Sequence, residues 1–518
     1  MSIRRRDLLS ALAPAAVYAQ RRPQRPNILF FFADDWGRYA GVYRDASRGS
    51  MSDVVKTPNI DRVAREGVLF TNAFMATPSC TPSRAAVSTG CYSFRTGRTA
   101  NLRGGSWKGA TDPGESLPGF GAMLEKSGYL VRSSYKTLQA NWLGGKAYQR
   151  GNTFLRYSQY VSEANAPSEA SRRRKQIEAQ AVEGVRRVFE ERLPGQPFFY
   201  VHGPINTHRP WVRGSGKKLW DIDPESLKGK LPEFLPDNET VREDVADYLG
   251  EAQALDMMVG AMWNELASRG ELENTVVVLS GDNGMGGMPR GKCNLYDFGC
   301  RAPLMIRFPG KAKAGHVAEE FVNLMDLAPT FLDMAGIAAP AAMDGRSLVP
   351  MLTGARDASR DFVVLSRERH VPDARAGNLP YPSRAIRTKD FLYIRNFKPD
   401  RNPMGDSVPG VEDRSYQELA ATHELLTYKD MDASPTKAWI LKHRLDAPQY
   451  YDLAFGKRPL EELYDLRADP DQTRNVAAQE SYAPQRQRLW ERLNKVMRQA
   501  NDPRLSDAFD RTPYIEEA

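Results

Sequence analysis

The sequence predicts an α/β fold, in which helices cover both faces of a mostly parallel sheet, followed by a smaller C-terminal α+β subdomain. Three observations support this prediction. Short apolar, strand-like runs alternate with helical patterns through the first two thirds of the chain, and such alternation is typical of parallel sheets. The chain has 518 residues, which at roughly 100 to 200 residues per domain indicates about two to four domains. Near residue 380 the alternation gives way to closely paired strands.

The predicted elements follow one another in the order that such a sheet requires. The first strand covers residues 27–33, and a helix at residues 57–67 ends at a glycine, a common helix stop. Residues 243–268 carry apolar side chains at helical spacing and predict one long helix. Further strands are expected at residues 197–202, 275–280 and 303–308.

The C-terminal part differs in pattern from the rest. Residues 383–395 predict two paired strands that turn at Lys389 and Asp390, and residues 401–414, rich in Asp, Pro and Gly, predict a long loop. The chain is therefore expected to have three parts. These are an export signal at residues 1–19, a main domain at residues 24–378, and a C-terminal subdomain with a small antiparallel sheet at residues 379–518.

The N-terminus has the pattern of an export signal. Three arginines at residues 4–6 precede an apolar stretch at residues 8–16, and small residues occupy both cleavage-site positions of the segment 17–19. Residues 5–9 also resemble a twin-arginine motif, which would send a folded protein across a bacterial membrane. We therefore expect a periplasmic or secreted protein. The alternative is a disordered basic N-terminus on a cytoplasmic protein.

Composition narrows the function only slightly. Hydrophobic residues make up 41% of the chain and charged residues 26%, as in an ordinary globular protein. After the signal, no apolar run approaches the roughly 18 residues of a membrane span. Removing the signal, with its three arginines and one aspartate, lowers the net charge from +8 to +6. Such a mildly basic surface suits anionic substrates, although a solvated surface explains it as well. We expect no nucleic-acid partner.

The cysteines do not indicate a disulfide scaffold, because there are only four of them. Cys293 and Cys300 flank one loop and could pair in an oxidising compartment. Two buried free thiols are the alternative that we favour. Cys91 is expected in the core.

Two motifs lie where open α/β sheets place their ligand sites, at the carboxyl ends of predicted strands. Asp34 and Asp35 end the first predicted strand, and Asp282 and Asn283, followed by a glycine, end the strand at residues 275–280. Between these two, the sequence Cys-Thr-Pro-Ser-Arg occupies residues 80–84. The motif at Asp282 and Asn283 is followed by Gly291-Lys292 and Asn294-Leu295-Tyr296.

This order of motifs closely resembles the type I sulfatases of the alkaline phosphatase superfamily. The resemblance runs from about residue 25 to the segment 462–470 and so covers most of the chain. It implies an alkaline-phosphatase-like sheet sandwiched by helices, with residues 24–378 as the catalytic domain. It also implies an enzyme that hydrolyses sulfate esters or sulfamates.

The two acidic motifs predict a metal site. Asp34, Asp35, Asp282 and Asn283 offer hard oxygen ligands, which Ca²⁺ and Mg²⁺ prefer, whereas Zn²⁺ would favour His or Cys. The resemblance implies one divalent cation here, usually calcium rather than magnesium, with the matured Cys80 as a further ligand. The cation would offset the charge of a bound sulfate. Taken singly, each residue could be an ordinary turn or cap residue at a strand end.

Cys80 is the predicted nucleophile. The resemblance implies that a sulfatase-maturing enzyme, such as a formylglycine-generating enzyme, oxidises this cysteine to Cα-formylglycine. In its hydrated form the aldehyde has two hydroxyl groups, of which one attacks sulfur and the other afterwards expels the sulfate. A serine could attack in the same way but lacks the second hydroxyl. The reaction is thereby divided into two easier steps.

Four further residues match positions that bind the reacting groups in the family. Arg84 would orient the hydrate, and Lys136 and Lys292 would hold the sulfate oxygens, where fixed positive charge stabilises the transition state. An arbitrary lysine is more often a solvated surface charge. His208 would bind sulfate and protonate the leaving oxygen, which a histidine can do near neutral pH. His202 lies inside a predicted strand and is expected to pack there.

One position departs from the family pattern. Sulfatases usually have a histidine two residues after the first lysine, where this chain has Leu138. The missing imidazole normally assists the hydrate, so another group replaces it or activity is reduced. His370 is a candidate replacement or a substrate contact, and a surface histidine is the alternative.

Three functions are consistent with these motifs. The first is a calcium-dependent sulfatase that acts on a sulfated carbohydrate outside the cytoplasm. Residues 291–299 most resemble relatives of the heparan N-sulfatases (N-sulfoglucosamine sulfohydrolases), which favours a sulfamate or a sugar sulfate. The second is a phosphonate monoester or phosphodiester hydrolase of the same superfamily. The third, suggested by Leu138, is an inactive protein that binds sulfated glycans.

Overall fold

The structure is a computed structural model that describes residues 25–45, 49–108, 110–150, 156–410 and 427–515. The predicted export signal lies outside these residues. The strands are β1 Asn27–Ala33, β2 Val68–Phe70, β3 Ala73–Phe74, β4 Leu130–Tyr135, β5 Lys146–Arg150, β6 Phe198–Gly203, β7 Thr275–Gly281, β8 Leu304–Arg307, β9 His316–Ala318, β10 Val322–Asn323, β11 Phe362–Arg367, β12 Ser383–Thr388, β13 Phe391–Asn396 and β14 Glu461–Asp465. The helices are α1 Pro58–Glu66, α2 Cys80–Thr89, α3 Phe120–Lys126, α4 Ala140–Leu143, α5 Tyr157–Ser162, α6 Pro167–Glu191, α7 Ser215–Trp220, α8 Glu239–Ser268, α9 Asp297–Cys300, α10 Leu327–Met334, α11 Val349–Leu352, α13 Pro435–Lys442, α14 Pro448–Phe455 and α15 Ala483–Gln499.

A large, mostly parallel sheet forms the centre of the molecule. In the described part of the chain it has eight strands in the order β5-β4-β6-β1-β7-β8-β2-β9. Strand β1 lies between β6 and β7 and pairs with both in parallel, whereas β8 runs antiparallel to β7 and to β2. All seven residues of β1 are buried, as expected of a strand that is covered on both faces. The predicted α/β fold is confirmed.

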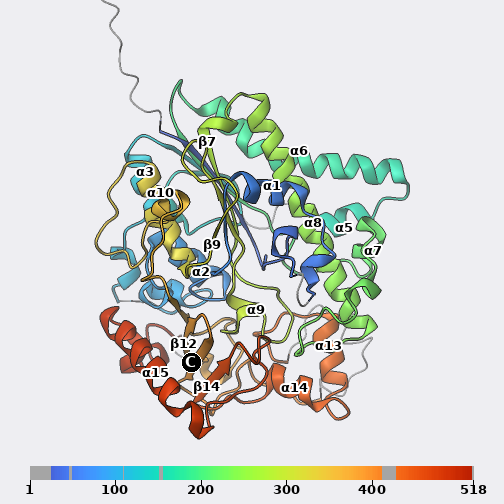
Figure 1. Ribbon diagram of the computed structural model, residues 1–518, viewed down its shortest axis with the longest axis vertical. Coiled ribbons are helices and arrows are strands. Elements are labelled where there is room, and N and C mark those ends of the chain that lie inside the picture. The colour runs from blue at the N-terminus through green and yellow to red at the C-terminus, as the bar shows by residue number, and fades with distance from the viewer. Residues whose placement is uncertain (1–24, 46–48, 109, 151–155, 411–426, 516–518) are drawn as a thin grey trace, which may run out of the picture.

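The two faces of β1 belong to two different hydrophobic cores. Ile28, Phe30 and Phe32 pack into one core together with residues of α3 and α10, while Leu29 and Phe31 pack into the other together with residues of α6 and α8. Alternate side chains of a strand point to opposite faces, so one apolar run serves both layers. Figure 1 shows α1, α6 and α8 on one side of the sheet and α2, α3 and α10 on the other.

The predicted helices and strands agree closely with those observed. The helix expected at residues 57–67 is α1, which ends before Gly67. The long helix expected at residues 243–268 is α8, which starts earlier because the side chain of Asn238 accepts a hydrogen bond from the backbone N–H of Val241. The strands predicted at residues 197–202, 275–280 and 303–308 are β6, β7 and β8.

A second, antiparallel sheet forms the smaller α+β part at the bottom of Figure 1, in the order β11-β12-β13-β14. Strands β12 and β13 pair around Lys389 and Asp390, as predicted. Helix α15 packs on this sheet through Leu489, Leu493 and Met497. Strand β11 precedes residue 379, so the small sheet draws a strand from the sequence before the predicted domain boundary. Residues 411–414 of the predicted loop lie outside the described residues.

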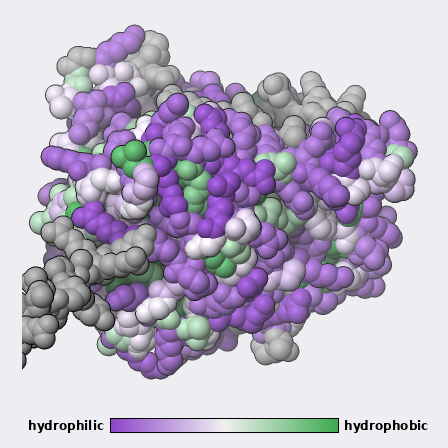
Figure 2. Space-filling view, turned by 90° about the horizontal axis from the view of Figure 1, so that it is seen from above, coloured by the Kyte–Doolittle hydropathy of each residue, from purple (hydrophilic) through white to green (hydrophobic). Residues whose placement is uncertain are grey.

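The surface is largely hydrophilic (Figure 2) and the cysteines are buried, as the composition predicts. Figure 2 shows a face that is largely hydrophilic, with hydrophobic side chains in small, separate groups. The exposed large hydrophobic side chains come from separate segments: Leu193, Val317, Leu445, Leu460 and Leu505. All four cysteines are free and buried, which confirms the predicted thiols and the core position of Cys91. In the portion of the chain that the structure describes, no helix is long and apolar enough to cross a membrane.

A buried carboxyl group in α8 predicts a pH-dependent stability. Glu251 accepts hydrogen bonds from the backbone N–H of Ser158 and the side chain of Asn206, yet burial raises its pKa to about 7. A carboxyl whose folded pKa is raised stabilises the protein at low pH, and this contribution is lost as pH rises through the folded value. Between pH 4.5 and 8, the unfolding free energy of the wild type should therefore fall relative to Glu251→Gln by on the order of 3 kcal/mol.

Urea denaturation of both proteins at several pH values measures this difference. Glu190→Gln, at an exposed position on α6, is the matched control and should follow the wild-type curve. Parallel curves for the wild type and Glu251→Gln would contradict the prediction.

Candidate active site

The acidic motifs meet at the carboxyl ends of two neighbouring strands. Strands β1 and β7 pair in parallel up to Ala33 and Gly281, so Asp34 and Asp35 emerge beside Asp282 and Asn283. The ligand atoms of Asp34, Asp35, Cys80 and Asp282 all lie within 4.8 Å of one another, and all four residues are buried. The structure thus brings together residues that lie far apart in the sequence.

Direct contacts link Cys80 to this group. Its Sγ lies 3.4 Å from Asn283 Oδ1 and 3.8 Å from Asp35 Oδ1. Asn283 Nδ2 donates to Asp35 Oδ1 at 2.6 Å, and the backbone N–H of Asp35 donates to Asp282 Oδ1 at 2.9 Å. Asp35 has a φ of 58°, in the left-handed region, which turns the chain sharply after β1. These contacts bring the carboxylates of Asp35 and Asp282 and the amide of Asn283 together beside Cys80, and oxygen-rich clusters of this kind suit a hard cation.

Helix α2 places Cys80 and Arg84 on the same side. Cys80 is its first residue, and Arg84 follows one turn later, so their side chains share a face. Arg84 is 2% exposed; its Nε donates to Asp282 Oδ2 at 2.8 Å and its Nη1 donates to the carbonyl of Lys136 at 2.6 Å. The guanidinium therefore fixes the acidic group to the segment that follows β4.

Two lysines lie against the paired aspartates. Lys136 Nζ is 2.7 Å from Asp34 Oδ2, and Lys292 Nζ is 2.9 Å from Asp35 Oδ2. Lys292 Nζ also lies 3.2 Å from His208 Nε2. Fixed ammonium groups in this arrangement suit the binding of an anion next to the carboxylates.

Burial and neighbouring charges shift the pKa values of Asp282, Asp34 and Cys80 in different directions. Burial raises the pKa of Asp282 to about 6. For Asp34, burial is outweighed by Lys136 and His208, which hold its pKa well below the usual value. Burial also raises the pKa of the Cys80 thiol well above its ordinary value.

The two histidines near the site differ in environment. His208 Nδ1 is 2.6 Å from the carbonyl oxygen of Arg209, which can only accept, so Nδ1 carries the proton and Nε2 faces Lys292. This side chain is 25% exposed. His202 is buried in β6, with its ring 4.7 Å from that of Phe31, and burial lowers its pKa to about 3. His202 therefore packs in the core, as predicted.

The structure shows where Leu138, which replaces the usual histidine of the family, and the candidate replacement His370 lie. Leu138 is buried in the apolar core. His370 is 4% exposed, and its Nδ1 lies 2.8 Å from the hydroxyl of Ser79, the residue before Cys80. The alternative of a surface histidine is therefore wrong. His370 lies close to the start of α2.

Two residues beside the site were not predicted from the sequence. One is Ser79, which joins His370 to the start of α2. The other is Asp432, whose Oδ2 is 3.4 Å from Lys292 Nζ. Neither belongs to a motif with a recognisable spacing, so the sequence carries no signal for them.

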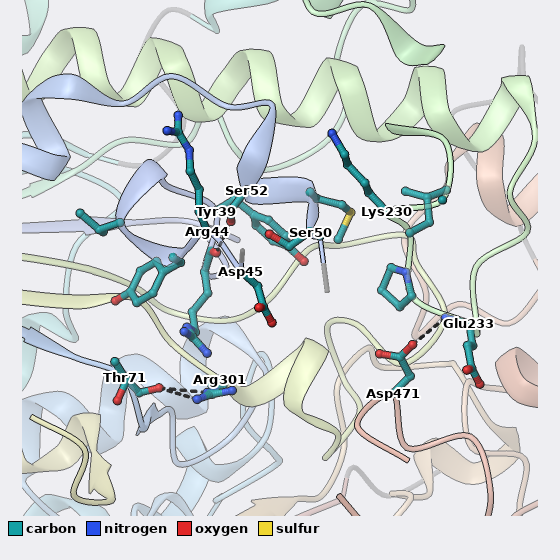
Figure 3. A pocket seen from close by; sticks show the side chains of 18 residues that line it. Tyr39, Arg44, Asp45, Ser50, Ser52, Thr71, Lys230, Glu233, Arg301 and Asp471 are labelled. Atoms are coloured by element: carbon teal, nitrogen blue, oxygen red, sulfur yellow. Dashed lines mark hydrogen bonds between the residues drawn. The ribbon is translucent and has the colours of Figure 1, made fainter. Parts of the chain in front are cut away.

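Another pocket, of about 650 Å³, lies outside the group that contains Cys80. Figure 3 shows its lining, with Tyr39 and Arg44 on one wall and Glu233 and Asp471 on another, and Arg301 bonded to the carbonyl of Thr71. It shares no residue with the predicted active site. None of the site residues described above lines this pocket.

The chain is similar in sequence to known sulfatases over most of its length. A family model described as "Sulfatase" matches residues 26–337, and one described as "N-sulphoglucosamine sulphohydrolase, C-terminal" matches residues 291–402. The chain is 26% identical to an ulvan-active sulfatase of Formosa agariphila over 93% of this chain and 76% of that protein. It is 27% identical to the N-sulphoglucosamine sulphohydrolase of Homo sapiens over 93% of this chain and 92% of that protein.

Solved structures show the same fold. One of them, a protein in complex with its substrate D-glucosamine-2-N,6-O-disulfate, is similar with a TM-score of 0.59. The similarity covers 93% of this chain and 100% of that chain, at 18% sequence identity.

Proposed function

Because this chain belongs to the type I sulfatases of the alkaline phosphatase superfamily and is a sulfuric ester hydrolase, we propose that it hydrolyses sulfate esters or sulfamates of a sulfated glycan. We propose a formylglycine at Cys80 and a divalent cation as its reactive groups. One observation carries the proposal: Cys80 lies among three carboxylates, and the ammonium groups of Lys136 and Lys292 border that group.

The donor set fits a hard cation. Asp34, Asp35, Asp282 and Asn283 would hold it, because ligand atoms of the three carboxylates lie within 4.8 Å of one another and of Cys80, and Asn283 Oδ1 lies 3.4 Å from Cys80 Sγ. Oxygen ligands favour Ca²⁺, or less often Mg²⁺, over Zn²⁺. When bound, the cation would offset the negative charge of the sulfate group.

The position of Cys80 fits the proposed modification. As the first residue of α2, it lies at the positive end of the helix dipole, where developing negative charge is stabilised. A formylglycine would supply, in its hydrated form, one hydroxyl for attack on sulfur and a second for release of the sulfate. A sulfatase-maturing enzyme is the partner that this proposal requires.

The surrounding side chains would bind and protonate the substrate. Lys136 and Lys292 would contact the sulfate oxygens, and Arg84 would keep Asp282 and Asp34 in place through its ion pairs. With Nδ1 bonded to the carbonyl of Arg209, His208 presents Nε2 to the site. Nε2 lies 3.2 Å from Lys292 Nζ, which can only donate, so His208 would have to gain a proton at Nε2 before it donates one to the leaving oxygen or nitrogen.

His370 is the candidate for the role left open by Leu138. Its Nδ1 contacts the hydroxyl of Ser79, the residue that precedes Cys80, so it would hold the start of α2 in place. We propose His370 as a positioning residue for Cys80.

The names of the relatives support a carbohydrate substrate. They include an ulvan-active sulfatase and an N-sulphoglucosamine sulphohydrolase, and we favour a sulfamate or a sugar sulfate. The pattern of residues 1–19 supports export to the periplasm or beyond.

Turnover measurements test the proposed function. The protein is produced together with a maturation enzyme, and the release of sulfate is measured from sulfated oligosaccharides and from 4-nitrophenyl sulfate. Bis(4-nitrophenyl) phosphate and a phenylphosphonate monoester serve as comparison substrates. Higher kcat/KM on the sulfates is expected. Higher values on the phosphorus esters would favour the phosphonate monoester or phosphodiester hydrolase, and binding without turnover would favour a sulfated-glycan-binding protein.

Removing the metal should abolish most of this activity. Chelation leaves the carboxylates without the cation that offsets the sulfate charge, so kcat/KM should fall roughly 100-fold or more, since a bound metal is worth several kcal/mol. Adding Ca²⁺ should restore activity and raise the melting temperature, because a ligand that binds only the folded state stabilises it.

Asp282→Asn is the variant for this test. It removes one carboxylate, so its melting temperature should respond more weakly to Ca²⁺ than that of the wild type. An equal response of both proteins would contradict the proposed ligand set.

A further inference from the structure

We propose that Asp432 accepts a hydrogen bond from a hydroxyl group of the sugar that carries the sulfate, and that it thereby selects sugar sulfates over other sulfate esters. The inference rests on the proposed sulfatase function, since it assigns a substrate contact within the same site. Asp432 is supplied by the C-terminal part of the chain, just before α13.

Asp432 lies beside the residues that would bind the sulfate. Its Oδ2 is 3.4 Å from Lys292 Nζ, which in turn is 2.9 Å from Asp35 and 3.2 Å from His208 Nε2. Its side chain is 27% exposed, whereas those of Lys292 and Asp35 are 3% and 0% exposed. Asp432 therefore lies between the buried cation site and solvent, where the part of the substrate beyond the sulfate must lie.

Gly286 makes room for this carboxylate. A Cβ atom at this position would lie 2.4 Å from Asp432 Oδ2 and 2.9 Å from Asp35 Oδ2. The two carboxylates thus converge over one glycine, and Lys292 separates their charges. A side chain at residue 286 would have to displace one of them.

The segment around Asp432 is held in place on both sides. Before it, Asp430 forms ion pairs with Arg367 at 2.8 Å and Arg375 at 2.7 Å. After it, the hydroxyl of Ser434 donates to the carbonyl of Gly287 at 2.6 Å. Groups that are fixed before the substrate arrives lose little freedom when they bind it.

Two further contacts fix the same segment. Lys437 Nζ donates to the carbonyls of residues 427, 428 and 431. Thr436 is bonded to Asp244 of α8, against which α13 packs at the lower right of Figure 1. The position of Asp432 is therefore set by the fold.

Despite this, one oxygen of Asp432 is buried and unused. No hydrogen bond to its Oδ2 is found within the described ranges of the chain, and the 3.4 Å approach of Lys292 is a longer, purely electrostatic contact. A buried acceptor without a donor costs free energy, which a ligand that brings a donor recovers.

The chemistry of the carboxylate identifies the donor. An ionised carboxylate can only accept hydrogen bonds. The sulfate group of an ester is negative and has no proton to give, and the one proton of a sulfamate is on the nitrogen whose bond to sulfur is broken. The donor must therefore come from the remainder of the substrate. Sugar hydroxyl groups next to the sulfated position are such donors, whereas 4-nitrophenyl sulfate has none.

Asp432→Asn tests the proposal, because it keeps the shape and removes the charge. With N-sulfoglucosamine and glucosamine 6-sulfate, kcat/KM should fall roughly 10- to 100-fold, as for the loss of a hydrogen bond to a charged group. With 4-nitrophenyl sulfate it should change less than about threefold. Asp452→Asn, the same change at an exposed position of α14, should leave both values unchanged.

Equal losses on sugar and aryl substrates would overturn the proposal, because Asp432 would then act by positioning Lys292. No loss on either substrate would overturn it as well.

A binding measurement separates this inference from the proposed function. In the Cys80→Ala protein, adding Asp432→Asn should weaken binding of the two sugars by the same factor and leave binding of inorganic sulfate equal or tighter. If the wild type shows no turnover but this pattern is found, the proposed function fails and the inference stands. If neither sugar binds more tightly than inorganic sulfate to Cys80→Ala, no hydroxyl is recognised and the inference fails.

Discussion

Cys80→Ala should lower the turnover of sulfate esters by roughly 10⁴- to 10⁶-fold, the loss expected when the nucleophile of a covalent mechanism is removed. The effect should be this large because Cys80 stands at the centre of the site, 3.4 Å from Asn283 and 3.8 Å from Asp35. The measurement is sulfate release under matured conditions. The melting temperature should change little, since alanine fits the start of a helix. Residual activity near the wild-type level would contradict the proposed nucleophile.

Cys80→Ser is the matched control for the two hydroxyl groups of the hydrate. A serine can attack sulfur once but has no second hydroxyl to expel the sulfate, so about one equivalent of alcohol should be released before the reaction stops. Mass spectrometry of the tryptic peptide that covers residues 66–84 follows both proteins. It should show formylglycine in the wild type and a trapped sulfate in the serine variant. An unmodified thiol in matured, active wild type would contradict the formylglycine assignment.

Glu368→Gln should lower the free energy of unfolding by about 3 to 5 kcal/mol, the usual effect of removing one partner of a buried ion pair. Glu368 is 3% exposed, and it pairs with Arg504 and, at 2.8 Å, with Arg384. Both arginines are fully buried. Arg384 would keep its ion pair with Asp502, and Arg504 would keep those with Asp507 and Asp510, but the two buried guanidinium groups would lose the anion that they share.

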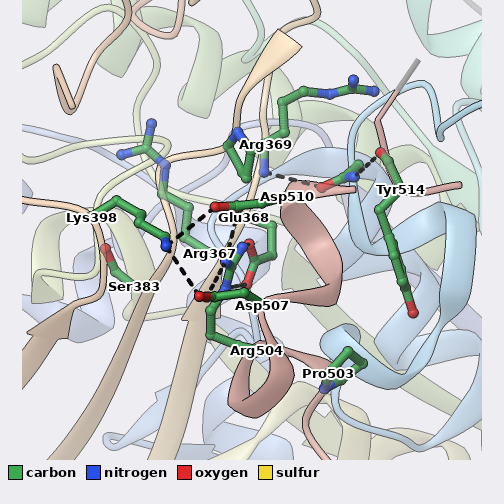
Figure 4. A network of polar contacts seen from close by, with 12 residues as sticks. Arg367, Glu368, Arg369, Ser383, Lys398, Pro503, Arg504, Asp507, Asp510 and Tyr514 are labelled. Atoms are coloured by element: carbon green, nitrogen blue, oxygen red, sulfur yellow. Dashed lines mark hydrogen bonds and ion pairs between the residues drawn. The ribbon is translucent and has the colours of Figure 1, made fainter. Parts of the chain in front are cut away.

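Figure 4 shows the network to which this residue belongs, in which Arg504 also contacts Asp507 and Asp510. Glu115→Gln is the matched control, because it removes a partner of Arg98 in a pair whose two side chains are 49% and 61% exposed. Its cost should be below about 1 kcal/mol. Urea denaturation compares the two variants, and equal losses would show that burial does not govern the strength of these pairs.

Because Glu368 lies two residues before His370, the same variant should also reduce activity.

The meeting of the two acidic motifs could be predicted from the sequence because each of them follows a strand. The apolar runs before Asp34 and Asp282 predicted two buried strands, and the carboxyl ends of parallel strands meet at one edge of a sheet. The structure places Asp34, Asp35, Cys80 and Asp282 together accordingly. The same local reasoning found α1 and α8, since helical spacing and caps are properties of neighbouring residues.

Other features could not be predicted, because they depend on contacts between distant segments. Nothing in the sequence around His370 indicates that it is buried against Ser79, and a surface position fits that sequence equally well. Asp432 had no motif at all, yet the docking of its segment on Gly287 and α8 brings it to Lys292. Arg84 was expected to orient the hydrate, and the structure shows in addition its ion pair with Asp282.

The sequence alone predicted the class of fold and the family correctly, because strand patterns, helix stops and metal-ligand motifs are local features of short stretches of chain. Only the packing of the chain shows which side chains surround Cys80 and that His370 is buried near it. The physical reason is that burial and charge pairing are set by segments hundreds of residues apart, and only their packing fixes the distances at which such groups interact.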